Sequence, residues 1–152
     1  MSDNWINIVP VLAEHTPTPE NAQNAIIILK QLAPEAEEIT VIEHDKIQFF
    51  DCGANLEMIQ CPQCKSQIEF DWWGKTMSSD FDENSGFHMK NYNLPCCSTS
   101  LSLNKLSYHF HQAFGRFALS VMNPNIGTLS LEDIDKLEAA LGCKISVVYQ
   151  HI

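Results

Sequence analysis

Basic residues are scarce in this sequence of 152 residues. Nine lysines and arginines stand against 19 aspartates and glutamates, which gives a formal net charge of −10. No segment has the excess of cations that phosphate binding by counterion release requires, so nucleic acid is not the expected partner. Acidic charge attracts basic partners at long range instead. The acids concentrate in residues 1–50, whereas residues 98–152 balance at zero.

Long apolar runs are also missing. No stretch approaches the roughly 18 consecutive apolar residues that indicate a transmembrane helix. The first residues, Met1 to Asn4, lack the basic stretch and apolar core of a signal peptide. We therefore expect a cytoplasmic protein with no membrane partner, and in that compartment thiols stay reduced.

Motifs for catalysis are absent as well. The sequence contains no Gly-rich phosphate loop, no His-Glu-x-x-His helix and no Ser/His/Asp order. A strand at 108–111 would place His109 and His111 on one face, where a second metal site with His151 is conceivable. Exposed histidines on a sheet are the favoured interpretation. We therefore expect a protein that is not an enzyme.

What the sequence does contain is clustered cysteine. Of six cysteines, two form Cys61-Pro62-Gln63-Cys64, and two more are adjacent as Cys96-Cys97. Two cysteines separated by two residues can turn both sulfurs to one ion, and a second pair completes a tetrahedron. The spacing predicts a zinc site built from Cys61, Cys64, Cys96 and Cys97. A site with four thiolates has no open position, so the zinc would be structural.

The spacing leaves alternatives open, because adjacent cysteines must splay apart to share one ion. If only one of them binds, His88 or Cys52 would supply the fourth ligand. Cys52 and Cys143 are otherwise expected to be buried as small hydrophobic residues. A redox Cys-x-x-Cys normally lies at a helix N-terminus. Residues 68–73 after Cys64 predict a strand, which favours metal over redox chemistry.

The remaining elements follow from periodicity and capping signals. Strands are predicted at 5–12, at 39–43 and 46–50 as a hairpin, at 115–122 and at 144–150, with helices at 19–33 and 131–141. Residues 108–122 fit a helix as well as a strand. Without the cysteine segment, this order resembles a ferredoxin-like α+β sandwich, an antiparallel sheet with two helices on one face. We predict a single domain, 1–152, with 51–106 as a zinc-ribbon insertion.

Four short motifs carry a resemblance to a known group of proteins. They are Cys61-Pro62-x-Cys64, Asp71-Trp72-Trp73-Gly74, Pro95-Cys96-Cys97 and Ser102-Leu103-Asn104-Lys105-Leu106. Over roughly residues 58–122 the chain resembles small, uncharacterised bacterial zinc-ribbon proteins. The resemblance implies zinc and a cytoplasmic bacterial protein, and it brings no known activity.

The adjacent Trp72 and Trp73 are the candidates for binding a partner. On a strand they would point to opposite faces, so one could lie exposed, and tryptophan is enriched at interaction hot spots. Packing of one on the ribbon and the other on the main sheet is the equal alternative. We expect a non-enzymatic, zinc-containing protein-binding module with a basic protein partner. One version is a bacterial immunity protein that neutralises a basic toxin, where acidic charge speeds association.

Two other functions remain open. A zinc-ribbon regulator associated with nucleic acid needs a basic patch, which only Lys65, Lys75, Lys90, Lys105 and Arg116 could form. A metalloenzyme needs an open position on the zinc ion.

Overall fold

A computed structural model describes residues 2–152 as an α+β fold with three α-helices and a mixed main sheet. The main sheet has the strand order β11-β1-β10-β2-β6-β5. Its longer strands are β1 (Asn4–Pro10), β2 (Glu38–Phe50), β10 (Ala113–Met122) and β11 (Ile145–His151). These four pair antiparallel with one another, whereas β2 and β6 (Gly86–Phe87) run parallel.

The capping signals define two of the helices as expected. Helix α1 (Pro19–Leu32) begins after Thr18, whose side chain accepts a hydrogen bond from the Asn21 amide at 3.2 Å. Helix α3 (Leu131–Leu141) begins with a capping box of Ser130 and Asp133, and Gly142 ends it in the left-handed region. Among residues 2–152, none of the helices combines the length and apolarity needed to cross a membrane.

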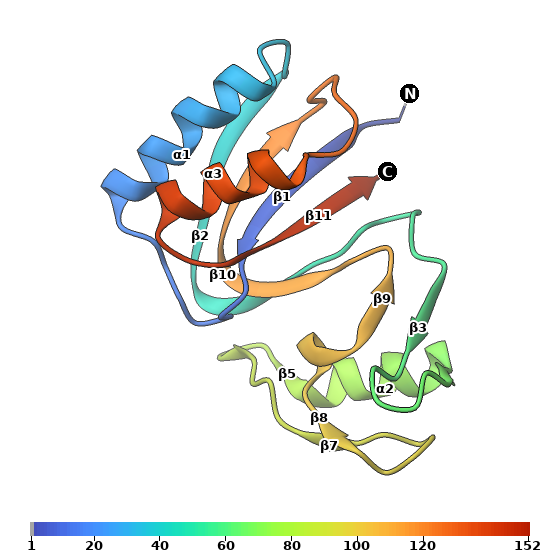
Figure 1. Cartoon of the computed structure of the whole chain (residues 1–152). Coiled ribbons are helices and arrows are strands. Elements are labelled where there is room, and N and C mark those ends of the chain that lie inside the picture. Colours follow the sequence, from blue (N-terminus) through green and yellow to red (C-terminus); the bar gives the residue numbers. More distant parts are fainter. Residues whose placement is uncertain (1) are drawn as a thin grey trace.

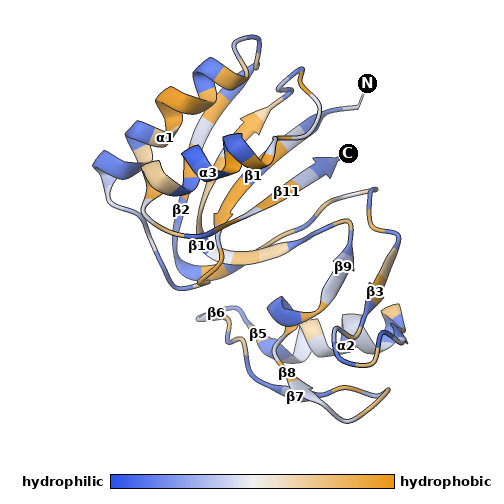
Figure 2. Ribbon diagram, in the orientation of Figure 1, coloured by the Kyte–Doolittle hydropathy of each residue, from blue (hydrophilic) through white to orange (hydrophobic). Residues whose placement is uncertain are grey.

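Helices α1 and α3 lie on one face of the main sheet, and the principal core fills the space between (Figure 1). Ile8 and Phe117 from the sheet pack there with Leu29 and Leu137 from the helices. Figure 2 shows hydrophobic residues concentrated on β1, β10 and the helices. Each buried side chain of this size stabilises the fold by about 1.5–3 kcal/mol.

The predicted hairpin at 39–50 is wrong. β2 is one unbroken strand in which His44 and Asp45 are strand residues. It pairs with β10 at residues 38–43 and again at 48–50, and between these two stretches four residues of β2 stand opposite Arg116 alone. Pairing to a neighbouring strand therefore outweighs the local preference for a turn.

The insertion begins after Phe50 and ends before Ala113, and these two residues are paired neighbours in the main sheet. Its short elements are β3 (Met58–Gln60), β4 (Gln67–Ile68), α2 (Phe70–Asp80), β5 (Phe81–Asp82), β6, β7 (Tyr92–Asn93), β8 (Ser100–Leu101), a 3₁₀ turn at Leu103–Lys105 and β9 (Ser107–His109). β9 pairs with β3, so the insertion extends beyond the predicted boundary at residue 106.

The predicted strand at 68–73 is also wrong, because helix α2 begins at Phe70. Trp73 and Met77 lie one helical turn apart, and both pack against a second core. This core is separate from the principal one and contains Ile59, Ile68 and Leu103. Ile47 of β2 and Phe114 of β10 also belong to this core, so it joins the insertion to the main sheet.

Candidate metal centre

The four predicted cysteines meet in the insertion. The sulfur atoms of Cys61, Cys64, Cys96 and Cys97 all lie within 4.8 Å of one another. The Cys61 and Cys97 sulfurs are 3.7 Å apart, and those of Cys96 and Cys97 are 3.8 Å apart. Four sulfurs this close can hold one metal ion, so both adjacent cysteines belong to the group.

A tight turn presents the first pair of cysteines. The Cys61 amide donates to the Ser66 carbonyl at 2.9 Å, and the Lys65 amide donates to the Cys61 carbonyl at 3.0 Å. Lys65 lies in the left-handed region, with φ of 65°. The Cys64 amide donates to the Cys61 sulfur at 3.5 Å.

The second pair lies on a turn of the same geometry. The Leu94 amide donates to the Thr99 carbonyl at 2.9 Å, the Ser98 amide donates to the Leu94 carbonyl at 3.0 Å, and Ser98 has φ of 61°. Cys97 therefore corresponds to Cys64, and buried Leu94 corresponds to Cys61. Cys96, at the third position of this turn, supplies the sulfur that Leu94 lacks.

The alternative ligands lie elsewhere. The Cys52 sulfur is buried in a third cluster, 3.4 Å from the Oε1 atom of Gln112. His88 has its ring beside Ser85 and is not part of the four-sulfur group. Burial raises the pKa of Cys52 and of Cys143, as expected for inert structural thiols.

The histidine site is not formed. His109 pairs through its ring with Gln60 at 2.9 Å, and His151 pairs with Asn4 at 2.7 Å. Within residues 2–152, the four cysteines are the one cluster of three or more potential ligands close enough to share an ion.

The surroundings of three of the thiols shift their pKa values in different directions. Hydrogen bonds from Ser66 lower the pKa of Cys64 to about 6, and those from Thr99 lower the pKa of Cys97. Loss of hydration, together with the sulfurs of Cys64 and Cys61, raises the pKa of Cys96 to about 12. Without a cation, the Cys96 thiol therefore resists ionisation beside the other sulfurs. A bound cation removes this conflict, because it binds all four as thiolates.

A carboxylate that sequence reasoning missed fixes the approach to the second turn. Asp80, at the end of α2, is fully buried. It accepts the backbone amides of His88, Met89 and Lys90 at 2.9–3.0 Å and the Tyr92 hydroxyl at 2.8 Å. Burial and Asp80 together raise the pKa of Tyr92 to about 12. The sequence shows only one aspartate among several in a polar segment, so no local signal marks it.

Trp72 and Trp73 lie on α2, half-buried against the insertion core, rather than on opposite faces of a strand. The Trp73 indole donates to the Tyr108 hydroxyl at 3.0 Å and meets the rings of Phe49 and Tyr108 edge-on. Since Phe49 belongs to β2, Trp73 joins the insertion to the main sheet. A role for these tryptophans in binding a partner stays a prediction.

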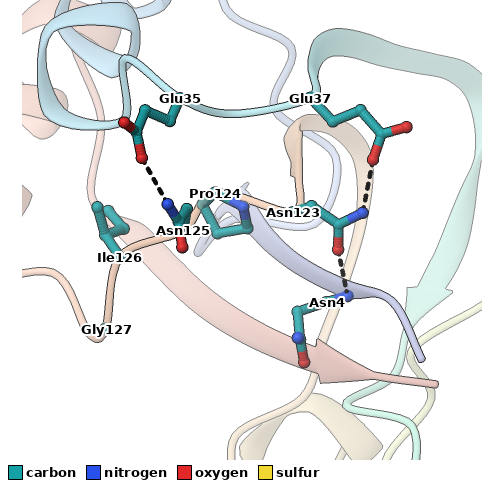
Figure 3. Close-up of a pocket in the computed structure, with 8 residues that line it drawn as sticks. All are labelled: Asn4, Glu35, Glu37, Asn123, Pro124, Asn125, Ile126 and Gly127. Atoms are coloured by element: carbon teal, nitrogen blue, oxygen red, sulfur yellow. Dashed lines mark hydrogen bonds between the residues drawn. The ribbon is translucent and has the colours of Figure 1, made fainter. Parts of the chain in front are cut away.

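A cleft of about 680 Å³ lies away from the cysteines, beside the loop that follows β10 (Figure 3). The Glu37 carboxylate accepts the Asn123 side-chain amide at 2.7 Å, and that of Glu35 accepts the Asn125 side-chain amide. The lining residues include no thiol, imidazole or hydroxyl. These carboxylates already have partners that fasten the loop to the segment before β2.

Comparison of the chain with protein-family models, with curated proteins and with solved structures gives no match. The chemistry of the centre follows from its donors. Four thiolates in a tetrahedral arrangement select zinc or iron and leave no position for water or substrate.

Proposed function

We propose that this chain is a non-enzymatic protein-binding module whose insertion is held together by one structural zinc ion. The observation that carries the metal assignment is the group of four sulfurs within 4.8 Å of one another. Structural zinc in small peptides contributes about 10–16 kcal/mol of folding free energy. The insertion is built from two- and three-residue strands and one short helix, so it depends on such a contribution.

The finer fold assignment belongs to the same proposal. The order β1-α1-β2-β10-α3-β11, with strands arranged β11-β1-β10-β2, supports a ferredoxin-like sandwich. Two turns of equal geometry, beside the small sheet β4-β3-β9, support a zinc ribbon in the insertion. A metal site of reduced thiols is consistent with the cytoplasm as the location.

The charge supports a basic protein as the partner. The net charge of −10 gives fast, steered association with a cation-rich surface. An immunity protein that neutralises a basic toxin, such as a nuclease, is the concrete version of this function. Closed metal coordination and the absence of catalytic motifs favour binding over catalysis.

Two measurements test the proposal. Elemental analysis of the purified chain should give one zinc per molecule and no iron. A tagged copy in its native host should capture a stoichiometric basic protein, and added salt should slow their association. Bound nucleic acid in place of protein would support the regulator, and salt-independent binding would contradict electrostatic steering.

A further inference from the structure

The two edges of the main sheet differ in how they are protected. At the β11 edge, the Ile145 amide is capped by the Glu138 carboxylate at 3.0 Å, and the Tyr149 carbonyl accepts the Asn55 side-chain amide at 2.9 Å. The His151 amide donates to the Cys52 carbonyl, and the His151 carbonyl accepts the Ala54 amide. The outer edge of β11 is therefore hydrogen-bonded to other parts of the chain at several points along its length.

At the opposite edge, the first half of β2 is open. β6 pairs with β2 only at Ile47, opposite Gly86. Residues 38–43 pair with β10 on one side, and on the other side nothing within residues 2–152 hydrogen-bonds to the backbone of residues 38–44. An open edge of seven residues, roughly 23 Å long, presents alternating amides and carbonyls to a further strand.

An apolar groove follows this open edge. Ile39, Val41 and Glu43 share the face that α1 covers, because side chains alternate along a strand. Beside them lies a pocket of about 170 Å³. Its apolar walls are Ala22 and Ile26 of α1, Val41 of β2, Phe117 of β10 and the prolines Pro17 and Pro19, and the polar residues Gln23 and Glu43 complete the lining. The volume is several times the about 30 Å³ that one water takes up in the liquid, so the pocket has room for one aliphatic side chain.

The charge around the open edge determines which kind of strand can pair with it. Residues 35–45 carry five acidic and no basic residue. Glu38 and Glu43 are exposed, and Val41 between them is 44% exposed. If a second copy of this chain paired through the same edge of β2, acidic residues of the two copies would lie opposite each other. Like charges in such positions destabilise a sheet. A strand with lysine or arginine next to its apolar residues is complementary.

We propose that the open half of β2 accepts an extended, basic segment of the partner protein as an added strand, with one apolar side chain in the groove beside α1. This inference rests on the proposed protein-binding function and assigns its surface. Backbone hydrogen bonds would supply affinity, and the groove and acids would supply specificity, as in other cases of strand addition.

The test uses the full, zinc-loaded chain and two synthetic peptides, one alternating valine with lysine and one alternating valine with glutamate. In amide NMR spectra, the valine–lysine peptide should shift the signals of residues 38–44. At ten times its Kd, it should slow hydrogen exchange of the outward-facing amides about tenfold. The valine–glutamate peptide should not bind.

Two variants sharpen the result. E38K/E43K should lose the valine–lysine peptide, whereas E132K/D135K, the same charge change on exposed residues of α3, should keep it. V41E adds an acid but removes the apolar contact, so it should also lose the peptide. Tighter binding by V41E would overturn the proposal, because it would indicate simple charge attraction.

Other outcomes also contradict the assignment. Shifts confined to β11 or the cysteine turns, equal binding of both peptides, or no shift at millimolar peptide would each overturn it. A dimer that V41E dissociates would assign the edge to a second copy. If a partner captured from the host binds V41E as tightly as the unmodified chain, the edge assignment fails while the binding function stands. If the peptide binds the edge but no host protein is captured, the edge assignment stands while the proposed binding function fails.

Discussion

Leu94 occupies, in the second cysteine turn, the position that Cys61 occupies in the first. Both residues donate and accept the same two turn hydrogen bonds, and both are buried. The sulfur missing at Leu94 comes from Cys96, two residues later in the same turn. The adjacent cysteines are thus a rearranged version of the first pair.

This equivalence predicts the effect of moving a ligand. C96S should weaken zinc binding by more than the about 10- to 100-fold that loss of an outer partner costs. L94C/C96S gives the second turn the spacing of the first and should recover most of that affinity. Competition with a chromophoric chelator measures both. Equal loss in the single and double variants would contradict the equivalence of the turns.

Removal of the metal should affect one part of the chain. The insertion core is separate from the core under α1 and α3, so a strong chelator should release the insertion and leave the main sheet folded. Amide signals from 58–109 should collapse, whereas those of β1, β11 and the helices should persist. Global unfolding on chelation would show that the insertion is required by the whole domain.

Thiol reactivity should divide the cysteines into two groups. In the zinc-loaded chain, the four ligands should resist alkylation, because the metal holds their sulfurs. Chelation should make these four reactive at once. Cys52 and Cys143 should stay slow in both states, because burial raises the pKa of each thiol. Mass spectrometry of the alkylated peptides distinguishes the groups, and rapid labelling of Cys52 before chelation would argue against its burial.

Asp80 should stabilise the insertion through its four hydrogen bonds. D80N keeps the shape but turns an amide group toward donors, so it should lower the free energy of unfolding by about 2–4 kcal/mol. Denaturant titration of zinc-loaded protein measures this difference. D71N, at an exposed carboxylate paired only with Lys75, is the matched control and should change stability by less than about 1 kcal/mol.

Alkaline pH should weaken the fold through Tyr108. Burial raises the pKa of this phenol above its ordinary value of about 10. Above pH 10, the unfolded chain releases a proton that the folded chain keeps, so stability is full below that pH and falls as pH rises. Y108F should show a shallower fall, measured as unfolding free energy from pH 9 to 12. An unchanged slope would contradict the role of Tyr108.

The sequence predicts most of the main sheet and the four cysteines that lie together, because each has a local signal. Thr18 and Ser130 cap their helices, and the cysteine spacing indicates shared metal. The sequence does not predict the helix at 70–80, because a short apolar run fits a strand and a helix alike. The packing of Trp73 and Met77 on the second core favours the helix. The continuity of β2 depends on its pairing with β10 on both sides of an irregular stretch at residues 44–47. The role of Asp80 depends on a loop eight to twelve residues away, so neither feature has a local signal in the sequence.

Because Phe50 and Ala113 face each other, the insertion begins and ends at neighbouring positions of the sheet. Strands β2 and β10 are therefore the two arms of a hairpin whose connecting turn is the entire insertion. Joining them requires closing a very long loop, and each doubling of loop length costs about 0.6 kcal/mol in entropy. A metal ion that folds the insertion before β2 and β10 pair would shorten the flexible part of that loop. Zinc should then speed the folding of the main sheet, although none of its ligands lies in a strand of that sheet.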